Sequence, residues 1–193
     1  MPDISAEPES AVAAGRPVVV ADRAGGGLVF AASRATTALM AFTVRHSSGF
    51  VCVALPAQRC DALALPPMHP RAARGGGATF CVAVDAVDGT TTGISASDRA
   101  ATALRLADPR AVPADFTRPG HVVPVAVRPS DTGGLAEVAA ALVGAAGEPP
   151  VAVFAHLVSP ADPTRMADEV ELDDFARHHG LPLVAPARPL PAS

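Results

Sequence analysis

The stretch TTGISASDRAATALRLADP (residues 91–109), followed by ADFTRPGHVVPV (114–125), carries more information about the fold than any other part of the chain. Ser97 and Asp98 precede apolar residues at helical spacing, and both residue types favour a helix start because they cap its first N–H groups and suit its dipole. The segment His121 to Val127 is rich in β-branched residues, which predicts a strand. The two strings therefore indicate a helix at 97–107 and a strand at 121–127.

The same patterns recur along the chain and predict one mixed domain. Strands are predicted at 16–20, 28–33, 50–55, 79–86, 121–127, 151–159 and 181–185, and helices at 36–46, 97–107, 135–147 and 166–180. Because strands and helices mix without strict alternation, we expect an α/β (α+β) fold, a single domain with a mixed β-sheet flanked by helices. We place the domain at 15–185, between a flexible N-terminus (1–14) and a flexible C-terminal tail (186–193), with mobile loops at 66–78 and 128–134.

Composition narrows the classes of function. The 193 residues carry a formal charge of -4 and include no tryptophan or tyrosine, so we expect no nucleic-acid partner. Apolar runs end well before the roughly 20 residues of a membrane span, and residues 1–10 are polar and acidic, so we expect no membrane partner and a cytoplasmic location. Cys52, Cys60 and Cys81 lack CxxC spacing, which favours buried reduced thiols. All 15 basic residues are arginines, which excludes a lysine Schiff base and a P-loop lysine.

Four further strings accompany the first two: ADR (21–23), LVFAASRATTALMAFTVRHSSGFVCVAL (28–55), CDALALPPM (60–68) and MADEVELDDFARHHGLPLVA (166–185). With them, the chain resembles the 3,4-dihydroxy-2-butanone 4-phosphate synthase family of the riboflavin pathway over residues 15–185. The resemblance implies an α/β domain with a mixed sheet that works as a homodimer. It also implies a reaction that turns ribulose 5-phosphate into a four-carbon ketone phosphate and formate.

One departure from the family motifs is a glycine run. The resemblance implies a magnesium ion held by a Glu and a His, because the oxygens of enediolates need a hard cation. Family members carry acidic residues after the Asp-Arg pair, whereas here Asp22 and Arg23 are followed by Ala24 and the run Gly25–Gly27. We predict that these glycines form a loop emptied of acidic side chains. The alternatives are a plain flexible hinge loop and a phosphate cradle, although no helix with Lys and Ser/Thr follows.

Two further departures lie later in the chain. The resemblance puts Leu135 at the position of the metal-binding His, and Asp131 and Thr132 at the positions of family arginines. His156 stands where the family has an acid/base Glu. We therefore predict a protein with no bound metal and no cofactor.

The surviving motif residues predict half of a polar pocket. His121, Cys52 and His156 are the predicted catalytic residues, since imidazoles and thiols move protons or attack carbon near neutral pH. Their structural alternatives are a hydrogen-bonded histidine, a small buried hydrophobe and a half-buried strand histidine. The predicted substrate-binding residues share polar side chains in the motif strings, and Asp98 and Arg99 have a helix cap and ion pair as their alternative: Arg23, Thr92, Ser95, Asp98, Arg99, Thr117 and Arg118.

The end of the last predicted helix contains two adjacent histidines. His178 and His179 precede Gly180, where donors or cations complement the terminal carbonyls, so we interpret them as structural. The acidic run at 168–174 is typical of a solvated helix face.

Together the departures predict a changed function. We expect a metal-independent enzyme that performs a lyase, isomerase, dehydration or condensation reaction on a small polar metabolite in a specialised bacterial pathway. One alternative is an inactive homologue that serves as a binding or heterodimer subunit. The other is a genuine synthase with the unchanged family reaction.

Overall fold

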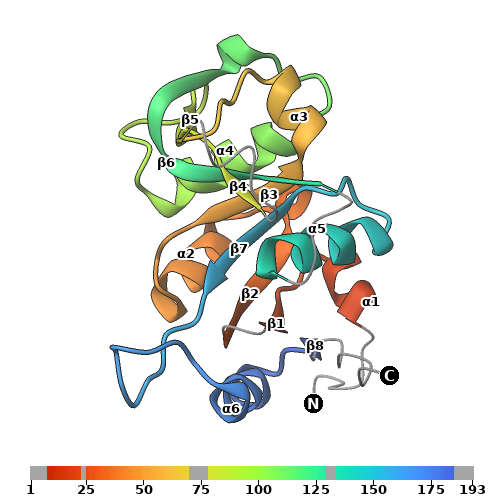
Figure 1. The fold of residues 1–193 in the computed structure, drawn as a ribbon, viewed down its shortest axis with the longest axis vertical. Coiled ribbons are helices and arrows are strands. Elements are labelled where there is room, and N and C mark those ends of the chain that lie inside the picture. The colour runs from red at the N-terminus through yellow and green to blue at the C-terminus, as the bar shows by residue number, and fades with distance from the viewer. Residues whose placement is uncertain (1–7, 23–24, 70–77, 129–133, 185–193) are drawn as a thin grey trace.

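A computed structural model of the chain describes residues 8–22, 25–69, 78–128 and 134–184 (Figure 1). Its described part forms an eight-stranded sheet in the order β4-β6-β3-β7-β2-β1-β8, with β5 paired to β6. Pairs β3–β6 and β1–β8 are parallel and the other pairs are antiparallel, so the predicted mixed sheet is confirmed. The strands are β1 (Val18–Asp22), β2 (Gly25–Ala31), β3 (Cys52–Pro56), β4 (Thr79–Phe80), β5 (Val84–Ala86), β6 (Phe116–Val127), β7 (Ala152–His156) and β8 (Leu183–Val184).

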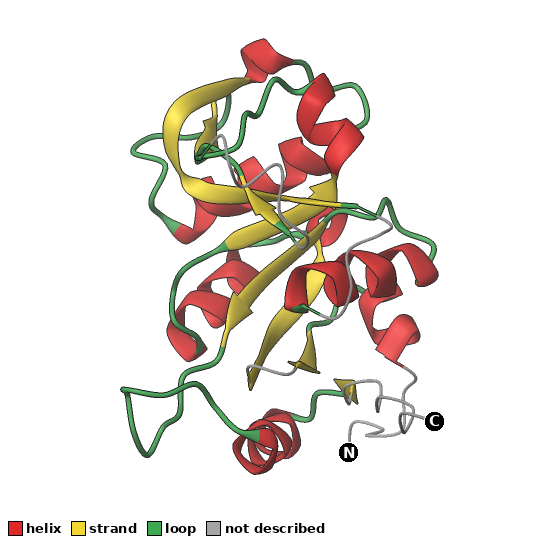
Figure 2. Cartoon of the chain, viewed as in Figure 1, coloured by secondary structure: helices red, strands yellow, loops and turns green. Residues whose placement is uncertain are grey.

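The helices cover both faces of the sheet (Figure 2). They are α1 (Pro8–Ala13), α2 (Thr37–His46), α3 (Ala57–Ala62), α4 (Ala96–Ala107), α5 (Leu135–Ala145) and α6 (Glu169–His179), with 3-10 turns at Ala32–Arg34 and Pro113–Asp115. Helices α1 and α5 bury one face, including Cys52 and Phe154. On the other face, α2 and α4 pack around Phe30, and α6 packs around Leu28. Because side chains alternate along a strand, successive β2 residues serve opposite layers.

Local capping explains several element boundaries. The hydroxyl of Thr36 accepts a hydrogen bond from the backbone N–H of Leu39 and begins α2, as the sequence predicts. Helix α4 begins earlier than predicted, because Ser95, not Ser97, accepts from the backbone N–H of Asp98. Gly180 ends α6 in the left-handed conformation, with φ of 62°, where a Cβ is unfavourable.

Some predicted boundaries differ from the structure. Residues 8–13 were predicted to be flexible but form α1, whose Ala11 and Val12 are buried against the α5 side of the sheet. Burial of these two side chains offsets the entropy of ordering the segment. The predicted strand 79–86 is two short strands, β4 and β5. Most of the predicted loops at 66–78 and 128–134, and the tail 186–193, lie outside the described residues.

No helix in the described ranges combines the length and the apolar character needed to span a bilayer.

Candidate functional site

A histidine and a buried aspartate form the centre of the candidate site. Nδ1 of His121, in β6, lies 2.8 Å from Oδ2 of Asp85, in β5, and the backbone N–H of His121 donates to Oδ1 of Asp85 at 2.9 Å. Asp85 is 7% exposed, whereas the His121 side chain keeps 41% of its surface exposed. A carboxylate that accepts from Nδ1–H fixes the tautomer in which Nε2 carries a lone pair. The ring can therefore accept a proton from a molecule outside the core.

The turn at Gly93 packs directly against this pair. Gly93 has φ of 82°, and a Cβ at this position would overlap the carboxylate of Asp85 and the ring of His121. Asp98 holds the turn, because its Oδ2 accepts from the backbone N–H groups of Thr91 (3.0 Å) and Gly93 (2.9 Å). These bonds, the Thr91 backbone bond first, lower the pKa of Asp98 because they stabilise the carboxylate. Asp98 thus stabilises the conformation of the turn that packs against the Asp85–His121 pair.

Arg99 lies close enough to the carboxylate of Asp85 to interact with its charge. Burial lowers the pKa of its guanidinium, and the charge of Asp85 opposes that shift. Its Nη1 donates to the carbonyl of Gly49 at 3.2 Å, while its buried Nε has no hydrogen-bond partner within the described residues. A buried donor without a partner is costly, and this is one of two buried polar side-chain atoms without a partner among the described residues.

The other predicted binding residues divide into two groups. Thr92 is exposed on the Gly93 turn, and Thr117 is exposed with its hydroxyl donating to the Asp85 carbonyl at 3.3 Å. Arg118 instead donates to the carbonyls of Leu63 (2.8 Å) and Phe116 (3.0 Å). Its guanidinium therefore stabilises the local backbone rather than binding a ligand. Arg23 lies outside the described residues.

The glycine run forms a strand, so the prediction of a loop is wrong. Gly25–Gly27 open β2 and pair with Asp22, Ala21 and Val20 of β1. A Cβ on Gly26 would lie 2.5 Å from the Val20 carbonyl oxygen and 2.7 Å from Cδ1 of Leu172. A Cβ on Gly27 would lie 2.7 Å from Cδ2 of Leu135. Close packing against α6 and α5, which strand propensity does not reveal, explains why these positions hold no side chain.

His156 ends β7 opposite Gly27, on the α5 side of the sheet. Burial lowers the pKa of its ring, and the charge of Asp22 partly opposes this effect. Asp22 also caps α5, because its Oδ2 accepts from the backbone N–H of Leu135 at 3.1 Å. Together Asp22, His156 and the start of α5 form a second group of polar residues, the His156 corner. The first group, the Asp85–His121 corner, consists of that pair and the Gly93 turn.

Cys52 lies between the two histidines in the sheet but inside the core. The residue is 1% exposed, and burial raises the pKa of its thiol to about 12. The thiol is therefore protonated at neutral pH, which supports the structural alternative rather than a nucleophile.

The register brings the two corners to one end of the sheet. Cys52 pairs with Val123 of β6 on one side and with Phe154 of β7 on the other. His121 precedes Val123 by two residues and His156 follows Phe154 by two; since β6 and β7 run in opposite directions, both lie at the same end. The segment between α2 and β3 connects them, because Ser48 N donates to the His156 carbonyl and the Gly49 carbonyl accepts from Arg99.

The family resemblance implies a bound magnesium ion, which needs side chains that can act as metal ligands. The described residues contain no group of three or more His, Cys, Asp or Glu side chains placed to hold a metal ion. Leu135 is buried and Gly26 and Gly27 have no room for a side chain, while Asp131 and Thr132 lie outside the described residues. The side chains of the described residues therefore do not fit a resident magnesium ion.

Comparison with known proteins identifies the family. The family model described as 3,4-dihydroxy-2-butanone 4-phosphate synthase matches residues 7–188. The chain belongs to this synthase family. The riboflavin biosynthesis protein RibBA of Salinispora arenicola is 45% identical over 180 residues, covering 90% of this chain and 42% of that protein. RibBA of Mycobacterium tuberculosis is 45% identical over 182 residues, with the same coverage. The chain thus spans about two fifths of the length of these curated relatives.

Solved structures of the synthase family share the fold. A crystal structure of 3,4-dihydroxy-2-butanone 4-phosphate synthase in complex with two magnesium ions aligns with a TM-score of 0.83 at 38% identity, covering 92% of this chain and 90% of that one. The synthase of Candida albicans aligns with a TM-score of 0.81 at 37% identity, covering 92% and 91%. These matches confirm the predicted fold class.

The same comparisons contradict the predicted change of function. Relatives at 45% identity over 90% of the chain are riboflavin biosynthesis proteins, and the matching family model describes the synthase itself. The prediction of an altered, metal-independent reaction in a specialised pathway is therefore wrong. That prediction gave a few motif positions more weight than the similarity of the whole domain.

Sequence reasoning missed Asp85 as a site residue. A signal was present, because Asp85 interrupts the apolar string TFCVAVDA (79–86), and a carboxylate within such a strand needs a buried partner. The partner, His121, lies 36 positions away, and a single sequence does not show which histidine that is.

Proposed function

We propose that this chain catalyses the synthase reaction of its family, which converts ribulose 5-phosphate into 3,4-dihydroxy-2-butanone 4-phosphate and formate. The five-carbon substrate contains every atom of both products, so the reaction needs no co-reactant. The Asp85–His121 pair is the observation that carries the proposal, since the first chemical step is removal of a proton next to the substrate carbonyl. The 45% identity to the riboflavin biosynthesis proteins supports the same reaction.

His121 acts as the general base in this proposal. Nε2 accepts the substrate proton, and the carboxylate of Asp85 stabilises the imidazolium that forms. The same Nε2 returns a proton at a later step. Asp85 does not touch the substrate and is a positioning residue.

Substrate binding is assigned to polar groups around the pair. The buried Nε of Arg99 is suited to an oxygen of the substrate, because it has no partner within the described residues. Thr92, on the Gly93 turn, and Thr117, whose hydroxyl donates to the Asp85 carbonyl, are both exposed. Ser95 and Asp98 hold the turn that carries Thr92. Arg23 remains a predicted substrate-binding residue.

His156 is the second acid/base group in this proposal. Burial lowers its pKa, so the ring is neutral near pH 7 and accepts protons. The replacements predicted at Ala24, Leu135 and His156 remain part of the proposal, and turnover measured with magnesium and with a chelator tests their effect on the magnesium requirement.

We also propose that two copies of the chain pair, in a cytoplasmic enzyme. Phe50 and Ile94 are 53% and 57% exposed, and both adjoin residues of the Asp85–His121 corner. Large exposed apolar side chains next to a polar site suit an interface with a second copy. Ile94→Ser should shift the sedimentation profile from dimer to monomer.

The test is turnover of ribulose 5-phosphate, followed as formate and four-carbon ketone phosphate, with magnesium and with a chelator. A family synthase serves as positive control, and the surface variant Val170→Ala as matched control. We expect both products in equal amounts, lost in His121→Ala and kept in Val170→Ala. No product under either condition, from protein that melts cooperatively, would refute the proposed activity and favour an inactive subunit.

A further inference from the structure

A cavity of about 520 Å³ lies on the opposite face of the sheet from α5. It is bounded by the C-terminal end of α2, the segment 157–167 and α6. Leu157, Pro160 and Phe175 supply apolar walls, and His46, His178 and His179 supply three imidazole rings. None of these residues belongs to the candidate site above. Cavities of a few hundred Å³ with mostly apolar walls and few polar groups are typical of small-molecule sites.

Aromatic rings crowd one wall of this cavity. The ring centroid of His179 lies 4.4 Å from Phe175, 4.8 Å from His46 and 4.8 Å from His178. Phe42 extends the cluster, with its centroid 4.6 Å from His46. Because aromatic rings prefer offset-stacked or edge-to-face contacts with other rings, a wall lined by Phe175 and three imidazoles favours a flat aromatic guest over a branched aliphatic one.

The imidazoles add hydrogen-bonding capacity to the aromatic wall. Within the described residues, no hydrogen bond is made by the ring nitrogens of His46, His178 or His179. Burial lowers the pKa of His179, and the neighbouring rings of His46 and His178 lower it further. A neutral imidazole offers one N–H donor and one acceptor nitrogen, so the wall can bind a molecule that carries both.

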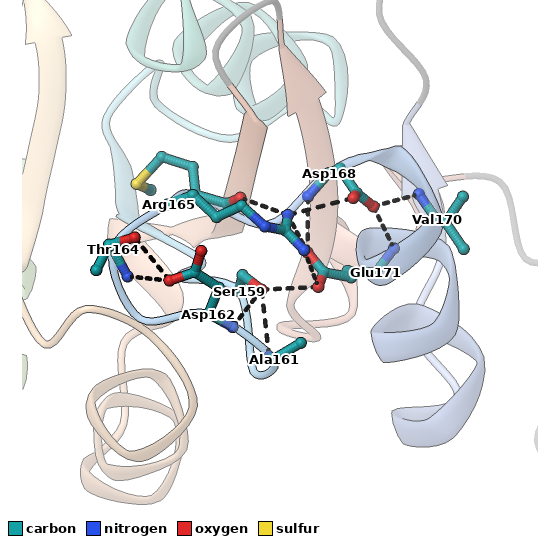
Figure 3. A network of polar contacts seen from close by, with 9 residues as sticks. Ser159, Ala161, Asp162, Thr164, Arg165, Asp168, Val170 and Glu171 are labelled. Atoms are coloured by element: carbon teal, nitrogen blue, oxygen red, sulfur yellow. Dashed lines mark hydrogen bonds and ion pairs between the residues drawn. The ribbon is translucent and has the colours of Figure 1, made fainter.

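Glu171, which lines the cavity, belongs to a polar network around the start of α6 (Figure 3). The Ser159 hydroxyl donates to Oε1 of Glu171 at 2.7 Å, and Nη2 of Arg165 donates to the same oxygen at 2.7 Å. Asp168 caps α6 by accepting from the backbone N–H groups of Val170 and Glu171. The loop wall is therefore ordered before any ligand binds, which reduces the entropy lost on binding.

Two carboxylates set the charge of the cavity. Glu171 is occupied by the network, whereas the side chain of Asp174 is 71% exposed, with Arg177 3.9 Å away. Asp174 lines the cavity four residues before His178. A carboxylate here favours a ligand that carries an N–H or a positive charge and disfavours an anion.

We propose that this cavity binds a flat, nitrogen-containing aromatic compound of one or two fused rings, at a site separate from the reaction site. The ring faces of Phe175 and His179 stack on the compound. The imidazole nitrogens form hydrogen bonds with its ring nitrogens, and the carboxylate of Asp174 accepts a hydrogen bond from an N–H on its edge.

Benzimidazole is the probe, titrated into the full chain and followed by NMR of the histidine ring protons. Cyclohexylmethanol, of similar size but not aromatic, is the control compound. We expect saturable shifts of His46, His178 and His179 with benzimidazole, and none with cyclohexylmethanol. Shifts confined to His121 or His156, equal binding of the control compound, or no shifts at all would overturn the proposal.

Two variants separate binding from folding. His179→Phe keeps a ring in the stack but removes its nitrogens, and we expect benzimidazole affinity to fall about tenfold. Val170→Ala, on the exposed side of α6 where Val170 is 69% exposed, should leave affinity unchanged. Unchanged affinity in a folded His179→Phe would refute the assignment of the imidazole contacts.

Discussion

The two corners of the candidate site are built by different means. At the Asp85–His121 corner, hydrogen bonds fix each group: Asp98 holds the Gly93 turn, and Asp85 holds His121 at 2.8 Å. At the His156 corner, packing dominates, because the glycines of β2 have no room for a Cβ and burial controls the histidine. Motif strings supply His121 and the short-range contacts of Asp98 with the Gly93 turn, but not Asp85, which lies 36 positions from His121. The His156 corner depends on contacts between segments far apart in the chain.

The largest expected effect tests whether the hydrogen-bonded corner performs the chemistry. His121→Ala should reduce formate release about 100-fold or more, the usual contribution of a general base. Asp85→Asn keeps the shape but leaves no charge to stabilise the imidazolium, so we expect about a tenfold loss. His156→Phe should cost less than His121→Ala. Steady-state turnover of all three variants decides the order, and a greater loss in His156→Phe would reverse the roles of the two corners.

A second prediction concerns how tightly the Gly93 turn is fixed. Gly93→Ala forces a Cβ into Asp85 and His121 at a positive φ, so we expect a loss of about 3 kcal/mol in unfolding free energy. Gly89 is the matched control: it has φ of 76° but no atom within 4 Å of an added Cβ. Gly89→Ala should therefore cost only about 1 kcal/mol, the backbone contribution alone. Urea denaturation measures both, and equal losses would show that the turn yields to the added methyl group.

These contrasts show what the sequence could supply. The mixed α/β fold, the cap at Thr36 and the end of α6 at Gly180 follow from local patterns, and the structure has them. Asp98 was predicted as a substrate-binding residue or part of a helix cap, and its hydrogen bonds to the Gly93 turn were not predicted. In contrast, the glycine run looked like a loop because strand propensity penalises glycine, while the partners that require it, Leu172 and Leu135, lie more than a hundred residues away.

A third prediction follows from the lowered pKa of His156. The pKa of His156 in the folded state lies below the ordinary value of 6.5. As pH falls below 6.5, the unfolded chain therefore binds more protons than the folded chain. Stability should therefore decrease from about pH 6.5 downward until the folded-state pKa is reached, by at most about 1.4 kcal/mol per pH unit for one histidine. His156→Phe should remove this contribution and flatten the slope. His179 contributes in the same direction, so His179→Phe is the comparison variant. Chemical denaturation at several pH values measures each slope, and an unchanged slope in His156→Phe would contradict the buried, neutral state.

The smallest expected effect concerns Cys52, which lies in the sheet between the two corners. The thiol is buried and its pKa is raised to about 12, so it is neither ionised nor accessible at neutral pH. Cys52→Ala should leave formate release within about threefold of the unmodified chain, since general acid/base residues contribute far more. It should lower the unfolding free energy by about 1 to 2 kcal/mol through the small cavity that it leaves. Iodoacetamide at pH 8 provides an independent check, because labelling of Cys52 should require unfolding. A loss of turnover near that of His121→Ala, in a variant that still melts cooperatively, would make the thiol a participant in the reaction and place the chemistry across the sheet rather than at its Asp85–His121 corner.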